Sequence, residues 1–153
     1  MDLLTEKEKN YLKHFTSSKD KAILIQHEKH RKPVNLVDTL PKLEELLADL
    51  PHYNLWGIDV EYYSEEHSFV CTLQLSNIDR SYVVDALLLR EHINKLGDLF
   101  EQPTKLKIFH GCDNDIRWLC EDFSFRTVCI HDTCKAHSIL TGEKVSISLK
   151  KLT

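Results

Sequence analysis

Asp59 and Glu61 are two carboxylates that follow, one residue apart, the apolar run of residues 55–58. The run is typical of a buried strand, and the acids are expected to emerge at its end. Because the side chains of a strand alternate between its two faces, Asp59 and Glu61 should project to the same side. Two neighbouring carboxylates repel each other, and a shared hard divalent cation would remove that repulsion. The alternative is a pair of solvated acids at the start of a loop.

A third carboxylate, Asp115, stands near the start of a helical pattern over residues 112–122, directly after a predicted strand at residues 105–109. A carboxylate in the first turn of a helix lies near the positive end of the helix dipole, which stabilises it. If this strand lies beside the strand at residues 55–60, Asp115 faces the first acidic pair. Three converging carboxylates are typical of a Mg²⁺ or Mn²⁺ site, and two such ions about 4 Å apart can assist hydrolysis of a phosphodiester.

The elements that must position these acids can be read from apolar periodicity and from turn residues. Helices are predicted at 38–50, 87–100, 112–122 and 133–140, and strands at 55–60, 69–75, 81–84, 105–109 and 128–130. Short links between the first three strands predict an antiparallel meander, whereas strands that alternate with helices predict parallel pairing afterwards. The predicted fold class is therefore α/β, with a mixed sheet flanked by helices.

The composition is that of one globular domain, with 42% hydrophobic and 29% charged residues in a chain of 153. No apolar run approaches the roughly 20 residues that a membrane span needs, so no membrane association is expected. The five cysteines are odd in number and form no C-x-x-C pair, which favours an intracellular protein. Residues 1–32 carry eight Lys and Arg against five acids, and they are predicted to be a basic leader, loosely ordered, ahead of a domain at residues 33–153.

A second cluster of candidate ligands lies near the end of the chain, at Cys129, His131, Cys134 and His137. Two of them would share a face of the predicted strand, and two would lie three residues apart on the following helix. This set could form a Cys2His2 zinc site. The alternative is that the cysteines are small buried side chains, as free cysteines usually are.

Two motifs carry a resemblance to a known family. They are D-x-E at residues 59–61 and H-G-x-x-x-D-x-x-W-L at residues 110–119, and residues 68–76, 83–85 and 132–133 extend the match. Together they resemble the DEDD 3′–5′ exonuclease superfamily, and within it the ribonuclease D group. The similarity is greatest to the catalytic domain of the exoribonuclease that works with the nuclear RNA exosome.

This resemblance implies a ribonuclease H-like fold and two divalent cations, Mg²⁺ or Mn²⁺. It implies an enzyme that hydrolyses RNA from a single-stranded 3′ end to nucleoside 5′-monophosphates, with a nuclear location and the exosome as a partner. Asp59, Glu61 and Asp115 would be the catalytic metal ligands, and His110 and Asn114 would contact the terminal nucleotide. Trp118 and Leu119 would pack the helix that carries Asp115. Nothing in the motifs recognises a 2′-hydroxyl, so DNA remains an alternative substrate.

The chain departs from the family pattern in one respect. A third motif, Tyr-x-x-x-Asp, should follow the stretch at residues 145–152, but the sequence ends at Thr153. The domain is therefore expected to be incomplete at its C-terminus, with activity well below that of a chain extended through the third motif. The alternative is a catalytically inactive remnant of the fold that binds nucleic acid or protein.

Overall fold

The computed structural model describes residues 6, 32–63, 69–143 and 146–152. Apart from residues 6 and 32, the predicted basic leader lies outside the described residues. Lys32 already contacts the domain, because its Nζ donates a hydrogen bond of 2.6 Å to the carbonyl of Asn77. The Pro33 carbonyl accepts a 2.9 Å hydrogen bond from the Ser81 N–H. Lys32 and Pro33 thus both contact the domain, and the boundary between residues 32 and 33 stays a prediction.

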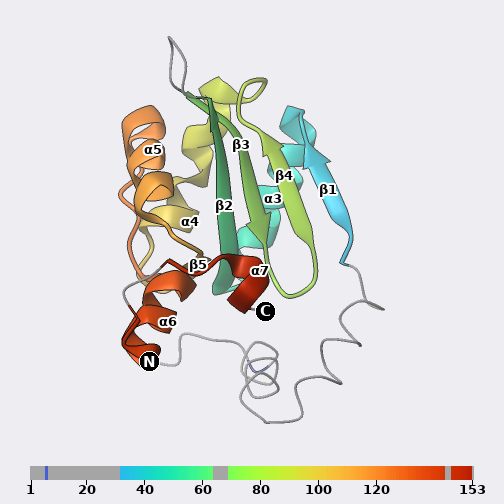
Figure 1. Ribbon diagram of the computed structural model, residues 1–153. Helices are drawn as coiled ribbons and strands as arrows, with labels where there is room; N and C mark the ends of the chain where they lie inside the picture. Colours follow the sequence, from blue (N-terminus) through green and yellow to red (C-terminus); the bar gives the residue numbers. More distant parts are fainter. Residues whose placement is uncertain (1–5, 7–31, 64–68, 144–145, 153) are drawn as a thin grey trace.

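Six strands form one mixed sheet in the order β1-β4-β3-β2-β5-β6 (Figure 1). Their bounds are β1 Val34–Val37, β2 Leu55–Tyr63, β3 Phe69–Ser76, β4 Ser81–Asp85, β5 Leu106–Phe109 and β6 Ile130–Asp132. Neighbours are antiparallel from β2 through β3 to β4, whereas β1 runs parallel to β4, β5 to β2, and β6 to β5. The predicted meander followed by parallel strands is confirmed, and so is the neighbourhood of β2 and β5.

Helices flank the sheet, with α3 behind it and α7 in front of it in Figure 1. Their bounds are α3 Leu40–Asp49, α4 Gly97–Glu101, α5 Asp113–Phe123, α6 Thr133–Thr141 and α7 Leu149–Leu152, together with two 3₁₀ helices, η1 Leu50–His52 and η2 Arg90–Leu96. Within the described part of the chain, no helix is long and apolar enough to cross a membrane.

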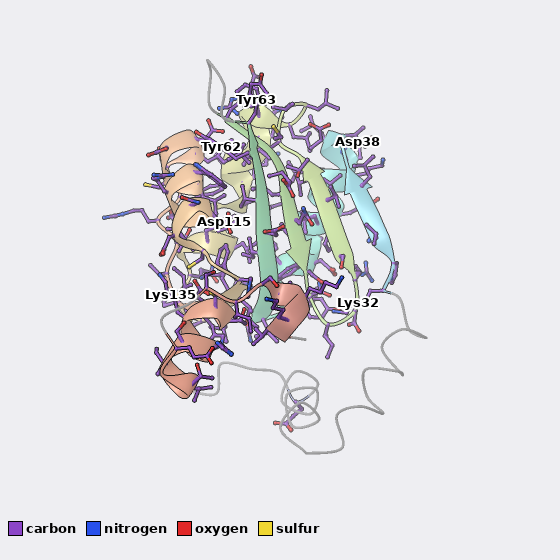
Figure 2. The ribbon with its side chains drawn as sticks, in the orientation of Figure 1. Lys32, Asp38, Tyr62, Tyr63, Asp115 and Lys135 are labelled. Atoms are coloured by element: carbon purple, nitrogen blue, oxygen red, sulfur yellow. The ribbon has the colours of Figure 1, made fainter. Side chains whose placement is uncertain are left out.

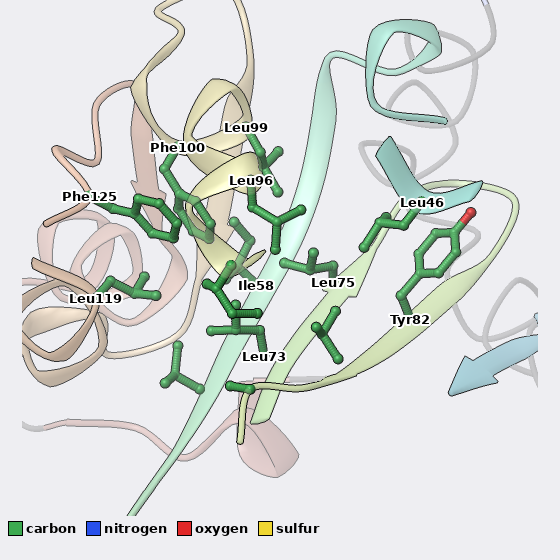
Figure 3. Packing of buried hydrophobic residues seen from close by; sticks show 14 of the residues in the cluster. Leu46, Ile58, Leu73, Leu75, Tyr82, Leu96, Leu99, Phe100, Leu119 and Phe125 are labelled. Carbon is green, nitrogen blue, oxygen red and sulfur yellow. The ribbon is translucent and has the colours of Figure 1, made fainter. Parts of the chain in front are cut away.

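One face of the sheet packs into the core, and alternation along the strands selects it. In β2, Ile58 and Val60 are buried whereas Asp59 and Glu61 are exposed, which is the predicted period of two. Figure 3 shows the buried side chains of the strands packed with those of η2 and α4. Apolar burial on this face leaves the opposite face of β2 for the carboxylates.

The strand that carries the acids is longer than predicted. β2 continues to Tyr63, so Asp59 and Glu61 lie within it rather than at its end. The cause is the antiparallel partner β3, which pairs Asp59 with Gln74 and Glu61 with Thr72. Hydrogen bonding to a neighbouring strand extends β2 through polar residues that an apolar pattern cannot identify as strand.

Two other predictions were wrong in part. Residues 87–100 do not form one α-helix but a turn, the 3₁₀ helix η2 and the short α4. Their buried side chains recur at spacings of three and four residues, which both helix types allow. Strand β1 was missed, because only Val37 of its four residues is buried and no alternation marks it. The helix predicted at residues 38–50 is divided in two: α3 ends at Asp49, and the 3₁₀ helix η1 follows at once and includes Pro51.

The central strand β3 provides a direct test of the core. Leu73 is fully buried whereas Leu88 is 69% exposed. We expect Leu73→Ala to lower the free energy of unfolding by about 2–5 kcal/mol, because it removes buried methyl groups and leaves a cavity. Leu88→Ala is the matched control and should change it by less than about 0.5 kcal/mol. Urea denaturation of both variants measures the difference, and equal losses would contradict this packing.

Candidate active site

The acids of β2 lie where β2 extends beyond its parallel neighbour. The pairing between β2 and β5 ends at Gly57 and Ile108, two residues before Asp59. Helix α5 then runs beside the remaining part of β2, and the ring of Trp118 stacks on Tyr62 with centroids 4.3 Å apart. Figure 2 shows Tyr62 and Asp115 in the region between α5 and β2. The strand and the helix thus bring the first and second motifs together, as predicted.

The far end of α5 is fixed to the sheet by Asp122. Its Oδ2 accepts hydrogen bonds from the Val70 N–H at 2.8 Å and from an Arg90 guanidinium nitrogen at 3.1 Å. The helix ends at Phe123, and the next residue, Ser124, has the left-handed backbone conformation typical of a helix terminus. Leu119 is fully buried beneath the helix. Trp118 and Leu119 therefore pack α5 against the sheet, as the resemblance implied.

Asp115 is the buried carboxylate of the site, with 8% of its surface exposed. Burial raises its pKa to about 6, and the negative charges of Asp59, Asp132 and Glu61 contribute to the increase in that order. Among the described residues, no hydrogen bond or ion pair to its carboxylate is found. The three predicted acids therefore lie close enough for their charges to interact, and Asp115 lacks a compensating positive charge within the described chain.

Asp59 and Glu61 face solvent on the open side of β2. The Gln74 side chain donates a long hydrogen bond of 3.5 Å to Glu61 Oε1. Asp59 also lines a groove of about 720 Å³ on this face, together with His110 and Thr133. Among the residues described, no three His, Cys, Asp or Glu side chains are arranged as a ready set of metal ligands. The carboxylates share one neighbourhood without enclosing a defined ion position.

The fit of this neighbourhood to a cation rests on the chemistry of its donors. All three candidate ligands are carboxylates, which are the oxygen donors that Mg²⁺ and Mn²⁺ prefer. Burial, and then the repulsion from nearby carboxylates, raise the pKa of Asp115, and a cation would offset that repulsion. The residues therefore fit a divalent cation by type and by charge.

His110 and Asn114, the candidate nucleotide contacts, both have partners within the chain. His110 Nε2 donates to the Ile147 carbonyl at 2.7 Å, so that nitrogen carries a proton, and Nδ1 lies 2.8 Å from the Thr133 hydroxyl oxygen. Asn114 is exposed, and its Oδ1 accepts a 3.0 Å hydrogen bond from Arg117. A nucleotide would have to replace or share these bonds, and the assignment of both residues remains a prediction.

The alternative zinc site is not assembled. Cys129 precedes β6 and has a left-handed backbone, with φ of 55°, so it does not alternate with His131 along a strand as predicted. Cys134 is buried, with its thiol 3.4 Å from the Ser146 hydroxyl oxygen. Among the described residues, no group of three such ligands forms around them. The reading of these cysteines as small packed side chains fits better.

Sequence reasoning gave no separate role to Asp132, the last residue of β6. The residue is 8% exposed, and its carboxylate accepts four backbone hydrogen bonds from the turn after β5 and from the start of α6. Burial alone would raise its pKa, but these bonds outweigh burial and hold the pKa well below its usual range. A buried Asp next to Thr at a helix start was the available signal, since Asp is a preferred N-cap residue.

Comparison with known proteins defines the family. A model of a 3′–5′ exonuclease family, DNA_pol_A_exo1, matches residues 34–153. The chain belongs to this family. The match covers the whole sheet and every helix that positions the three acids, and it starts at the first residue of β1.

Within the family, the chain is similar to RRP6 and to exosome component 10 proteins. Exosome complex exonuclease RRP6 of Saccharomyces cerevisiae is 38% identical over 102 residues, which are 65% of this chain and 14% of that protein. The exosome complex component 10 homolog of Drosophila melanogaster is 36% identical over 115 residues, which are 74% of this chain and 13% of that protein. The chain thus spans about one seventh of the length of these relatives.

Solved structures agree with the fold. The catalytic core of RRP6 from Trypanosoma brucei, in a mutant form, has a TM-score of 0.68 and 33% identity, and the match covers 71% of this chain and 31% of that chain. Trypanosoma brucei RNase D in complex with RNA has a TM-score of 0.62 and 18% identity, and the match covers 68% of this chain and 38% of that chain. At this identity it supports the fold alone. The mixed sheet with flanking helices is the ribonuclease H-like fold.

The raised pKa of Asp115 predicts how stability depends on pH. Its carboxyl binds a proton more tightly in the folded chain, at a pKa of about 6, than at the ordinary value of 3.8. The folded state therefore loses stability as pH rises from about 4 through 6, by up to about 3 kcal/mol. Asp115→Asn cannot ionise, so without divalent cations it should be more stable than the parent at pH 8 and similar at pH 4.

Urea denaturation at pH 4 and pH 8 measures this difference. Asp98→Asn, at an exposed position of α4, is the control and should shift neither curve. Mg²⁺ at pH 8 should reduce the gap between Asp115→Asn and the parent chain. Equal stability of the two proteins at pH 8 without Mg²⁺ would show that the charge of Asp115 is not confined among like charges.

Proposed function

We propose that this chain is the catalytic part of a metal-dependent 3′–5′ exoribonuclease. It hydrolyses RNA phosphodiesters from a single-stranded 3′ end and releases nucleoside 5′-monophosphates. The observation that carries the proposal is the interaction of Asp115 with the charges of Asp59 and Glu61, since it unites the two motifs of the exonuclease family beside the part of β2 that extends past β5.

The three acids have different tasks in this proposal. Asp59 and Glu61, on the open face of β2, would hold divalent cations on the side from which substrate arrives. Asp115, buried at the start of α5, would hold the same ions from the protein side. When bound, two Mg²⁺ or Mn²⁺ ions activate water and stabilise charge on the leaving 3′-oxygen. The family generally uses divalent metal ions, which agrees with this donor set.

His110 and Asn114 would orient the terminal nucleotide. His110 lines the groove that also contains Asp59, so a nucleotide in contact with it would reach the acids. The Nε2 proton that His110 now gives to Ile147 is the one it could offer to a phosphate or sugar oxygen. Asn114 is exposed on the first turn of α5, beside Asp115 in the chain.

The names of the relatives support a proposed partner and location. The similar proteins from yeast and fruit fly are named as an exosome exonuclease and as a homolog of an exosome component. We extend that association to this chain, with the RNA exosome as partner and the nucleus as location. Co-purification of exosome subunits with a tagged chain from nuclear extract would test it, with Asp59→Ala as a variant that should retain binding.

The decisive experiment uses RNA labelled at the 5′ end or at the 3′ end, incubated with the 153-residue chain and Mn²⁺. We expect slow shortening from the 3′ end that stops with a chelator. Asp59→Ala and Asp115→Ala should each reduce the rate roughly 10²-fold or more, because positioning and charge-stabilising groups contribute on that scale. Asp98→Ala is the matched control and should leave the rate unchanged.

The outcomes separate the alternatives. Trimming that is equal for single-stranded DNA and RNA would identify a general exonuclease. RNA binding without any metal-dependent trimming would identify an inactive remnant of the fold. Activity that survives in both Asp→Ala variants would mean that the carboxylates around α5 are not the catalytic site.

A further inference from the structure

Asp132 occupies a position between three elements. It is the last residue of β6, it is almost fully buried, and it pairs with Phe109 at the end of β5. The turn that leads into α5 and the first turn of α6 both donate hydrogen bonds to its side chain. Its side chain is therefore in reach of two helix starts.

Both carboxylate oxygens of Asp132 are in use. Oδ1 accepts the N–H groups of Gly111 at 3.0 Å, Cys134 at 2.8 Å and Lys135 at 3.2 Å. Oδ2 accepts the N–H of Cys112 at 3.0 Å. The bonds to Cys134 and Lys135 are an ordinary N-cap of α6. The bonds to Gly111 and Cys112 are different, because they connect α6 to a turn that is distant in the chain.

This second pair of bonds fixes the start of α5. Gly111 has a φ of 76°, which is the left-handed region that favours glycine. Cys112 is the N-cap residue of α5, and its carbonyl accepts the 3.0 Å bond from Ile116 that begins the helix. Asp115 follows three residues later. A change in the Asp132 contacts would therefore move the first turn of α5 and with it the Asp115 carboxylate.

We propose that Asp132 is a positioning residue for Asp115. It holds the turn after β5 against the start of α6, so that the first turn of α5 directs Asp115 toward the acids of β2. Asp132 does not itself serve as a metal ligand, because its oxygens are already occupied by backbone N–H groups. The consequence for cation binding rests on the proposed function, whereas the consequence for the orientation of α5 does not.

A serine at this position separates the capping of α6 from the hold on the start of α5. Serine is a good N-cap residue with one side-chain oxygen, so Asp132→Ser keeps a cap for α6 but is too short to hold Gly111 and Cys112 as well. Asp85 provides the matched control. Its Oδ1 accepts the N–H groups of Leu87 at 3.0 Å and Leu88 at 2.9 Å, two and three residues on, without the bridge to α5.

The measurements are amide NMR spectra of the full chain and its affinity for Mn²⁺ alone. In Asp132→Ser we expect faster hydrogen exchange at Gly111 and Cys112, shifted amides at residues 113–115, and retained protection of Lys135. Mn²⁺ affinity should fall about 10- to 100-fold, the range typical for residues that orient metal ligands. Asp85→Ser should change none of these signals. Asp132→Asn, which keeps one acceptor oxygen, should give an intermediate loss and serves if the serine variant does not fold.

Two results would overturn the proposal. One is unchanged amides at residues 113–115 in Asp132→Ser while Gly111 and Cys112 exchange freely. The other is Mn²⁺ affinity within about twofold of the parent despite shifted amides. If the parent chain itself binds no Mn²⁺, the proposed function fails, and the amide signals of α5 alone decide the role of Asp132.

Discussion

The site depends on one constraint, which is that β2 is longer than its parallel neighbour. The pairing of β5 with β2 ends at Gly57, and beyond it β3 is the only strand partner of β2 among the described residues. An uncovered strand edge is unfavourable in the interior of a fold, and α5 covers it. Because the chain enters α5 directly after β5, the first turn of the helix comes to lie beside the exposed acids of β2. The close approach of Asp115 to Asp59 follows from this arrangement of strand lengths.

Three aspartates, Asp132, Asp122 and Asp115, have different tasks because the groups around their carboxylates differ. Asp132 is surrounded by N–H donors, which favour its ionised form. Asp122 is paired with the Arg90 guanidinium. Asp115 is buried near negative charges, which disfavour its ionised form. Hydrogen-bond donors and a guanidinium use the oxygen lone pairs that a cation would need. Of these three, only the carboxylate without such partners in the described chain remains available as a ligand.

Much of this could be predicted from the sequence. The alternation of Ile58 and Val60 with the two acids of β2, and the placement of Asp115 in the first turn of a helix, are local patterns with known periods. The extension of β2 to Tyr63 could not be predicted, because pairing with β3 determines it. The bridge from Asp132 to Gly111 was missed for the same reason, since it joins residues that only the assembled sheet brings together.

A register shift in the sheet completes the positioning of α5. Between Glu61 and Tyr62 the pairing with β3 skips Cys71, so that Tyr62 lies opposite Val70. Such a bulge bends a strand and increases its twist. The N–H of Val70 is held by Asp122 at the end of α5, and Tyr62 stacks on Trp118. The helix is thus anchored at its end by the irregularity of β3 and at its start by Asp132. With both ends of α5 fixed, the orientation of Asp115 is set by backbone contacts rather than by its own side chain.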